Sequence, residues 1–158
     1  MDSQNAAAVS RLLAACYVFL AERQGFSDAQ LRRLLNERAA ENQIQKSSQE
    51  YERFVAVTGG EIAGFVGVEG NEVAELFVAP ERQGQGVGRR LFHHAEWLIS
   101  SRGHRTLTVH TTGYAIPFYL AMGMHIVAEM PCSYGPLEGW TLTYLEKALS
   151  EPAASDTE

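Results

Sequence analysis

The segment LFVAPERQGQGVGRRL, residues 76–91, runs from a hydrophobic stretch through a glycine-rich turn into a helical pattern. Its three glycines stand at alternate positions: Gly84, Gly86 and Gly88. The first turn of a helix leaves backbone N–H groups without acceptors, and glycines let an anion approach that backbone closely. The segment therefore predicts a binding site for a phosphate-bearing ligand. The neighbouring arginines are candidate charge partners: Arg82, Arg89 and Arg90.

Length and composition describe one ordinary globular unit. The chain has 158 residues, of which 46% are hydrophobic and 20% are charged, so we expect a single domain over residues 1–149. Residues 150–158 are acidic and have no hydrophobic pattern, so they are predicted to be a disordered tail. The formal net charge of −6 argues against nucleic acid as a partner, because affinity for a phosphate backbone needs clustered cations. The arginines near Gly84 therefore indicate a small anionic ligand.

Cysteine usage and the lengths of the hydrophobic runs bear on the compartment. Cys16 and Cys132 give neither a disulfide framework nor the spacing of metal ligands. We therefore expect two reduced thiols in a cytoplasmic protein that holds no metal. The apolar run at residues 12–21 is too short to span a bilayer, so no membrane segment is expected.

The hydrophobic periodicity predicts a mixed α+β fold. Helical spacing covers residues 5–24, and Ser27 with Gln30 forms a capping box that starts a second helix, expected to fray at residues 46–49. Three β-rich runs separated by glycine turns predict an antiparallel meander. A helix after the glycine-rich turn, a strand parallel to the one before it, a short helix and two final strands complete the order. The expected strands are residues 54–58, 62–68, 72–79, 105–111, 125–130 and 140–149, and the short helix covers residues 115–122.

Three explanations compete for the glycine-rich turn. A dinucleotide-binding fingerprint requires glycine at its sixth position, where this chain has Arg89. It also requires an acidic residue near the next strand, which instead offers Thr106, Thr108 and His110. A P-loop requires Gly-Lys-Ser/Thr, which the sequence lacks. A plain turn without a ligand rarely needs three alternating glycines flanked by arginines, so this explanation ranks below a ligand site.

Residues 83–88, QGQGVG, match the pattern Q/R-x-x-G-x-G/A, and in this the chain resembles the GNAT superfamily of acyl-CoA-dependent N-acyltransferases. AIPFYLAMGM, residues 115–124, is similar to the A-x-x-F-Y-x-x-x-G-F segment of that family. The resemblance covers residues 51–149 well and the first two helices by pattern alone. The chain departs from the family in that it starts almost directly in the first helix, where the family usually has a short strand that is here absent or irregular, and in having Thr112 for Asn and Met124 for Phe. The resemblance implies a GNAT-like fold, with a mostly antiparallel sheet, one parallel strand pair and flanking helices.

The resemblance implies acetyl-CoA as co-substrate. The glycine loop is expected to hold its pyrophosphate through backbone amides, and a bulge in the preceding strand is expected to free an N–H toward the thioester carbonyl. The implied strand residues are Leu76, Phe77 and Val78. The implied loop residues are Gln83, Gly84, Gln85, Gly86, Val87, Gly88 and Arg89. Further expected cofactor contacts are Thr112, Ala115 and Phe118, of which Phe118 also has the pattern of a core residue.

Acetyl transfer to an amine requires a neutral amine, a polarised thioester and stabilisation of the departing thiolate. By the resemblance, Tyr119 is the general acid beside the sulfur, and its alternative role is a core aromatic. Glu72 and Glu75 are the candidate bases, although each is equally well explained as a solvent-facing carboxylate. Being three positions apart, they face opposite sides of a regular strand. His110 is a third candidate because histidine titrates near neutrality, and some family members use only water.

The acceptor is expected between the first two helices, around Gly25 and Phe26, and the loop 131–139, with Tyr134 and Trp140 as candidate lining residues. The resemblance implies an N-acetyltransferase that acts on a primary amine of a small molecule or peptide by direct attack in a ternary complex. A homodimer is compatible with the sequence. The alternatives are a non-catalytic acyl-CoA-binding sensor or interaction module on the same fold, and a nucleotide or dinucleotide binder.

Overall fold

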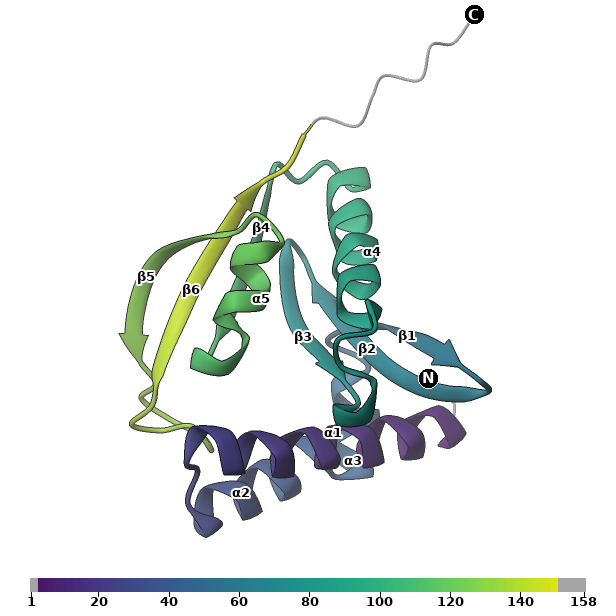
Figure 1. Ribbon diagram of the computed structural model, residues 1–158, viewed down its shortest axis with the longest axis vertical. Helices are drawn as coiled ribbons and strands as arrows, with labels where there is room; N and C mark the ends of the chain where they lie inside the picture. The colour runs from purple at the N-terminus through teal and green to yellow at the C-terminus, as the bar shows by residue number, and fades with distance from the viewer. Residues whose placement is uncertain (1–2, 151–158) are drawn as a thin grey trace, which may run out of the picture.

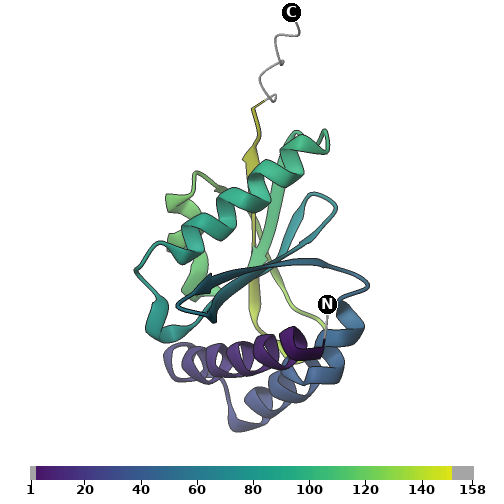
Figure 2. The same cartoon turned by 90° about the vertical axis from the view of Figure 1, so that its right-hand side faces the viewer.

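The computed structural model describes residues 3–150 and shows a six-stranded sheet with helices on both faces (Figures 1 and 2). The strand order is β1-β2-β3-β4-β6-β5. The strands are β1 (Glu52–Thr58), β2 (Glu61–Glu69), β3 (Glu72–Val78), β4 (Thr106–Thr111), β5 (His125–Pro131) and β6 (Thr141–Ala148). The predicted α+β class is confirmed, because β3 and β4 are parallel and the other neighbouring strands are antiparallel. Apart from Ser150, the expected tail lies outside the described residues.

The helices form two layers, one on each face of the sheet (Figure 2). One layer holds α1 (Ser3–Gln24), α2 (Asp28–Leu34), the π-helical turn η1 (Leu35–Ala39) and α3 (Glu41–Ser47). The other holds α4 (Val87–Ser101) and α5 (Ile116–Ala121). Short 3-10 turns precede these two helices, η2 (Pro80–Arg82) and η3 (Gly113–Ala115).

Each helical layer shares its own hydrophobic core with the sheet. Neighbouring residues of β2 serve the two cores: Phe65 packs with the α1 layer and Val66 with the α4 layer, and both are fully buried. Successive side chains of a strand point to opposite faces. A central strand covered on both faces is therefore apolar at consecutive positions, which explains the unbroken hydrophobic run in β2.

The N-terminal helical layer agrees with the sequence-based prediction at the start of α2 and differs from it further along the chain. The capping box is present, since the Gln30 N–H donates to Ser27 Oγ at 3.1 Å and the Ser27 N–H donates to Gln30 Oε1 at 2.9 Å. The single second helix expected to continue to residues 46–49 is wrong, because the chain passes through η1 and breaks at Ala40, where φ is −57° and ψ is 139°. Among the described residues, no strand precedes α1.

Within α1, residues Asn5–Gln24 are long and apolar enough to meet the length and composition criterion for a membrane span. The expectation that no segment reaches this threshold is therefore wrong. Core helices pass the same criterion, and α1 contributes Val9, Leu13 and Cys16 to the hydrophobic core shared with the sheet, each no more than 4% exposed. Packing in that core accounts for the apolar composition of the helix.

The sheet opens at its centre, between β3 and β4. The two strands pair at one position, Glu72 opposite Thr108, where the Thr108 N–H donates to the Asn71 carbonyl at 3.0 Å. The Asn71 amide also donates to the Thr106 carbonyl at 3.0 Å. Beyond this junction β3 stays paired with β2 and β4 stays paired with β6, so the two halves of the sheet separate from each other.

A bulge in β3 changes which side chains share a face. Gly67 of β2 pairs with Glu75, and the next residue, Val68, pairs with Val73. Ala74 is therefore the extra residue of the bulge, and Leu76 to Val78 pair regularly with β2, which corrects the bulge expected within residues 76–78. The extra residue shifts the alternation by one place, so Glu72 and Glu75 both line the cleft described below instead of facing opposite sides.

Gly64 lies where β2, β3 and α4 meet. A Cβ atom at this position would lie 2.7 Å from the Phe77 carbonyl oxygen and 3.0 Å from Leu91 Cδ1. We expect Gly64→Ala to lower the free energy of unfolding by about 1–3 kcal/mol in urea denaturation, because neither strand nor helix can move aside without cost. Gly113→Ala is the matched control, since no atom lies within 4 Å of its Cβ. Equal effects of the two substitutions would contradict the prediction.

Candidate active site

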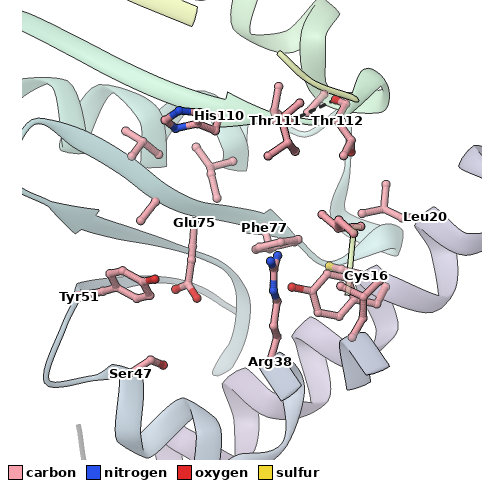
Figure 3. A pocket seen from close by; sticks show the side chains of 18 of the residues that line it. Cys16, Leu20, Arg38, Ser47, Tyr51, Glu75, Phe77, His110, Thr111 and Thr112 are labelled. Carbon is pink, nitrogen blue, oxygen red and sulfur yellow. Dashed lines mark hydrogen bonds between the residues drawn. The ribbon is translucent and has the colours of Figure 1, made fainter. Parts of the chain in front are cut away.

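The divergence of β3 and β4 opens a cleft of about 600 Å³. One wall comes from α1, η1 and α3, and the opposite wall comes from β3 and the end of β4 (Figure 3). The cleft brings together the following sequence-predicted residues: Glu72, Glu75, Leu76, Phe77, Val78, Gln83, His110, Thr112, Ala115 and Tyr119. The other predicted cofactor residues are not among its lining residues: Gly84, Gln85, Gly86, Val87, Gly88, Arg89 and Phe118.

The glycine loop follows β3 and leads directly into α4. Gly84 and Gly86 have φ values of 75° and 84°, in the left-handed region that favours glycine, and no atom lies within 4 Å of a Cβ built at either position. Gly86 is the N-cap of α4 and provides no side-chain cap. The N–H groups of the first turn, from Val87 to Arg89, therefore have no acceptor within the helix and fit an anionic group.

Three arginines place positive charge around this loop. Arg89 and Arg90 are exposed and Arg82 is half-buried. None of the three takes part in an ion pair formed among residues 3–150. An otherwise acidic chain thus has, beside a helix N-terminus, three guanidinium groups that form no ion pair within residues 3–150, and both features favour a phosphate group there.

Three of the predicted cofactor residues have packing roles in the structure. A Cβ at Gly88 would lie 3.3 Å from the Phe118 ring, so this glycine lets α4 approach α5 closely. The Phe118 ring also lies edge-on to Phe92, with centroids 6.2 Å apart. The Val87 side chain, 9% exposed, belongs to the same core, which leaves only its backbone for a ligand.

Thr112 and Ala115 line the cleft, and Gln83 links this side of it to the glycine loop. The Tyr114 hydroxyl donates to Gln83 Oε1 at 3.2 Å. The Tyr114 N–H donates to Gln24 Oε1 at 3.3 Å. η3, the loop and the end of α1 are thereby joined at the mouth of the cleft.

Cys16 faces the backbone of β3. Its thiol donates to the Val78 carbonyl at 3.3 Å. Burial, with a smaller contribution from the charge of Glu81, raises the pKa of Cys16 to about 12. A thiol that stays protonated at neutral pH is a poor nucleophile, so Cys16 forms part of the cleft wall and does not accept an acyl group.

Tyr119 lies in the cleft wall on α5 and is 4% exposed. Its ring packs against Phe92 and Phe118, with centroid separations of 6.2 Å and 5.2 Å. Burial raises the pKa of the Tyr119 hydroxyl above its ordinary value of 10.0. The hydroxyl therefore remains protonated at neutral pH and is available as a hydrogen-bond donor.

Glu72 and His110 form a pair at the point where the two strands separate. His110 Nδ1 lies 3.0 Å from Glu72 Oε1, and both side chains are about one-third exposed to the cleft, at 38% and 34%. The His110 ring also packs on Tyr144 of β6, with centroids 4.6 Å apart. When Nδ1 carries the proton and donates it to Glu72, the lone pair of Nε2 is available to accept one.

Glu75 lies in the same cleft but is already paired. Arg53 of β1, whose side chain is 1% exposed, donates to both Glu75 carboxylate oxygens at 2.6 Å and 2.9 Å. The same guanidinium donates to the Ile44 carbonyl at 3.0 Å and to Ser47 Oγ at 2.7 Å. Of the two sequence-predicted carboxylates, Glu75 thus joins β1, β3 and α3, whereas Glu72 lies next to an imidazole.

Sequence reasoning missed the residues on the opposite wall. Arg38 and Tyr51 line the cleft, together with Tyr17 of α1. Of the residues expected near an acceptor, Phe26 lines the cleft, but Trp140 does not and packs edge-on against the Phe26 ring at 4.7 Å. The side chain of Tyr134 is 81% exposed and is not among the lining residues either.

Comparison with known proteins agrees with this geometry. Residues 21–133 match the acetyltransferase (GNAT) domain family, and the chain belongs to this family. No curated protein matches the chain in sequence. Similar solved structures include a GCN5-related N-acetyltransferase from Rhodopseudomonas palustris, with TM-score 0.81 and 22% identity over 92% of this chain and 91% of that one.

Two further structures of the same fold were solved with coenzyme A. The PaiA N-acetyltransferase from Thermoplasma acidophilum in complex with coenzyme A has TM-score 0.75 and 14% identity, covering 94% of this chain and 95% of that one. An aminoglycoside 6'-N-acetyltransferase complexed with coenzyme A has TM-score 0.62 and 18% identity, covering 90% and 92%. At these identities the likeness shows the fold.

The Arg53–Glu75 pair provides a test of the structural role of Glu75. We expect Arg53→Met to lower the free energy of unfolding by about 3–5 kcal/mol in urea denaturation, because it leaves a largely buried carboxylate without its partner. The double variant Arg53→Met/Glu75→Met should recover most of that loss, since no unpaired charge then remains. A double variant as unstable as Arg53→Met would contradict this assignment.

Proposed function

We propose that this protein transfers the acetyl group of acetyl-CoA to a primary amine of a small molecule or peptide, by direct attack in a ternary complex. The observation that carries the proposal is the cleft between β3 and β4. It has an anion-binding loop at the end of β3, and it contains both a hydrogen-bonded Glu72–His110 pair and a protonated tyrosine. The cleft thus contains a group to accept a proton and a group to donate one, and the glycine loop that adjoins it at Gln83 can hold the phosphates of the cofactor.

The residues present fit coenzyme A. The unpaired N–H groups at the start of α4 and the free arginines suit its phosphates. The diverging edge of β3, from Leu76 to Val78, offers backbone groups to an extended pantetheine arm, as a neighbouring strand would. When bound, acetyl-CoA supplies an activated acetyl thioester.

The chemical roles follow from the pairings in the cleft. His110 Nε2 accepts a proton from the amine, and Glu72 holds the imidazole in the required tautomer and stabilises it once it is charged. Tyr119 provides the hydrogen bond or proton that stabilises the departing sulfur. We assign Glu75 to positioning, because Arg53 already occupies both of its carboxylate oxygens.

Cofactor binding is tested by thermal unfolding. At about one hundred times its dissociation constant, a ligand of the native state adds about 2.7 kcal/mol of stability. For a domain of this size we expect acetyl-CoA to raise Tm by about 5–10 °C, with NAD and ATP as controls at the same concentration. An equal shift with NAD or ATP would favour the nucleotide-binding alternative, and no shift with acetyl-CoA would remove the basis of the proposal.

Tyr119→Phe distinguishes an enzyme from a sensor on the same fold. We expect thiol release in the presence of acetyl-CoA and an amine to fall at least about 100-fold, while the dissociation constant for acetyl-CoA stays unchanged, because only one hydroxyl has been removed. Tyr134→Phe is the matched control, since its side chain is 81% exposed and outside the cleft. Turnover at the unmodified rate in Tyr119→Phe would refute the assigned role.

A further inference from the structure

A π-helical turn presents an arginine to the acceptor side of the cleft. η1 (Leu35–Ala39) follows α2, and its Arg38 side chain extends into the cleft between Glu75 and Cys16 (Figure 3). A π turn replaces the spacing of the α-helix over one turn and often occurs at functional sites. Arg38 lies on the opposite side of the cleft from His110 (Figure 3), so a ligand that reaches both residues must extend across the cleft.

Arg38 has no carboxylate partner among residues 3–150, although two carboxylates line the cleft near it. Glu37 is engaged by Arg33, whose Nε donates to it at 2.7 Å and whose Nη2 donates at 3.3 Å. Glu75 is engaged by Arg53. The fold thus neutralises both neighbouring acids with other arginines and leaves the positive charge of Arg38 directed into the cleft.

Two tyrosines complete the surroundings of Arg38. Burial raises the pKa of Tyr17 to about 12, and the Arg38 guanidinium, which lies against the Tyr17 hydroxyl, opposes that rise. Burial likewise raises the pKa of Tyr51, again opposed by the charge of Arg38. Both hydroxyls stay protonated at neutral pH. The wall therefore offers a guanidinium fork and phenolic O–H donors, a combination that suits an anionic oxygen ligand.

We propose that Arg38 binds a carboxylate of the acceptor, which makes the acceptor an amine that also carries a carboxylate, such as an amino acid. This inference rests on the proposed acetyl transfer and names its substrate class. With the carboxylate held by the fork of Arg38, the amine of the same molecule is directed toward Glu72 and His110. A planar guanidinium binds a carboxylate through two parallel hydrogen bonds, which fixes orientation as well as charge.

The other carboxylates of the cleft leave little to recognise a polycationic acceptor. Glu72 is paired with His110, and Glu75 and Glu37 are neutralised by arginines. Glu50 lines the cleft without an ion pair among the described residues, but so does Lys46 with the opposite charge. Arg38 is therefore a positive charge on the acceptor side that no carboxylate within residues 3–150 neutralises, and it favours an anionic ligand.

The test compares matched acceptors. Thiol release from acetyl-CoA is measured with the common amino acids, β-alanine and γ-aminobutyrate, each against its carboxamide. At least one amino acid is expected to be acetylated with a kcat/KM about 10- to 100-fold above that of its amide, the range that charged hydrogen bonds supply. Arg38→Met should remove this preference and leave the KM for acetyl-CoA unchanged, and Arg38→Lys should restore only part of it. Arg32→Met, on the exposed face of α2 and outside the cleft, is the matched control.

Each outcome bears on the inference separately from the proposed function. If amides or phosphorylated amines react as well as the amino acids, the carboxylate assignment is overturned while the proposed acetyltransferase activity stands. The same holds if Arg38→Met lowers kcat/KM equally for an amino acid and for its carboxamide. If no amine reacts, the proposed function fails. Calorimetric titration then tests the carboxylate site independently of catalysis. It compares the binding affinities of N-acetyl amino acids with those of their amides in the presence of coenzyme A. Binding of the carboxylates that Arg38→Met weakens at least about 10-fold supports the site, and no preference over the amides overturns it.

Discussion

The single paired position between β3 and β4 is the constraint on which the cleft depends. Asn71 ties the start of β3 to β4 through its backbone carbonyl and its side-chain amide, while β2 and β6 hold the outer edges of the two strands. The strands can therefore separate only toward the C-terminal end of β3. Because Thr108 is opposite Glu72, His110 lies two residues further along β4 on the same face. The Glu72–His110 pair is thus a consequence of the strand register.

The bulge at Ala74 and the Arg53–Glu75 pair are two aspects of one arrangement. The extra residue turns Glu75 toward the cleft, and a carboxylate placed there with 16% exposure needs a partner to offset its lost hydration. Arg53 provides that partner and uses its remaining donors on Ile44 and Ser47. The ion pair therefore also holds α3, and with it the wall that contains Arg38. The geometry of β3 and the position proposed for acceptor recognition are consequently linked through one guanidinium, that of Arg53.

The parts of this structure that sequence predicted are those decided locally. The glycine loop, the capping box at Ser27 and the strand meander each depend on residues within a few positions of one another, so composition and spacing were sufficient. The bulge depends on which residue of β2 pairs with which residue of β3, and this register cannot be read from the sequence. For this reason the bulge expected within residues 76–78 is wrongly placed, and the expectation that Glu72 and Glu75 lie on opposite faces of the strand is wrong. The π turn at residues 35–39 contains neither glycine nor proline, so no local signal marked it. Arg53 and Glu75 are 22 positions apart, and Arg38 gains its significance only because other arginines engage its neighbouring acids.

The burial of Tyr119 also bears on the proton transfer that we propose for it. In water a tyrosine is a weaker acid than a thiol such as cysteine, with pKa values of about 10 and about 8.5, so it would not fully protonate a departing thiolate. Burial raises the pKa of Tyr119 further, which increases this mismatch if the sulfur remains hydrated. Cys16, in the wall of the same cleft, shows how this environment acts on sulfur, since burial foremost raises its thiol pKa to about 12. In the proposed reaction, a departing thiolate buried in this wall would be destabilised for the same reason, so its basicity would approach that of the tyrosine. In the proposed reaction, burial of both groups thereby brings the donor and the acceptor closer in proton affinity.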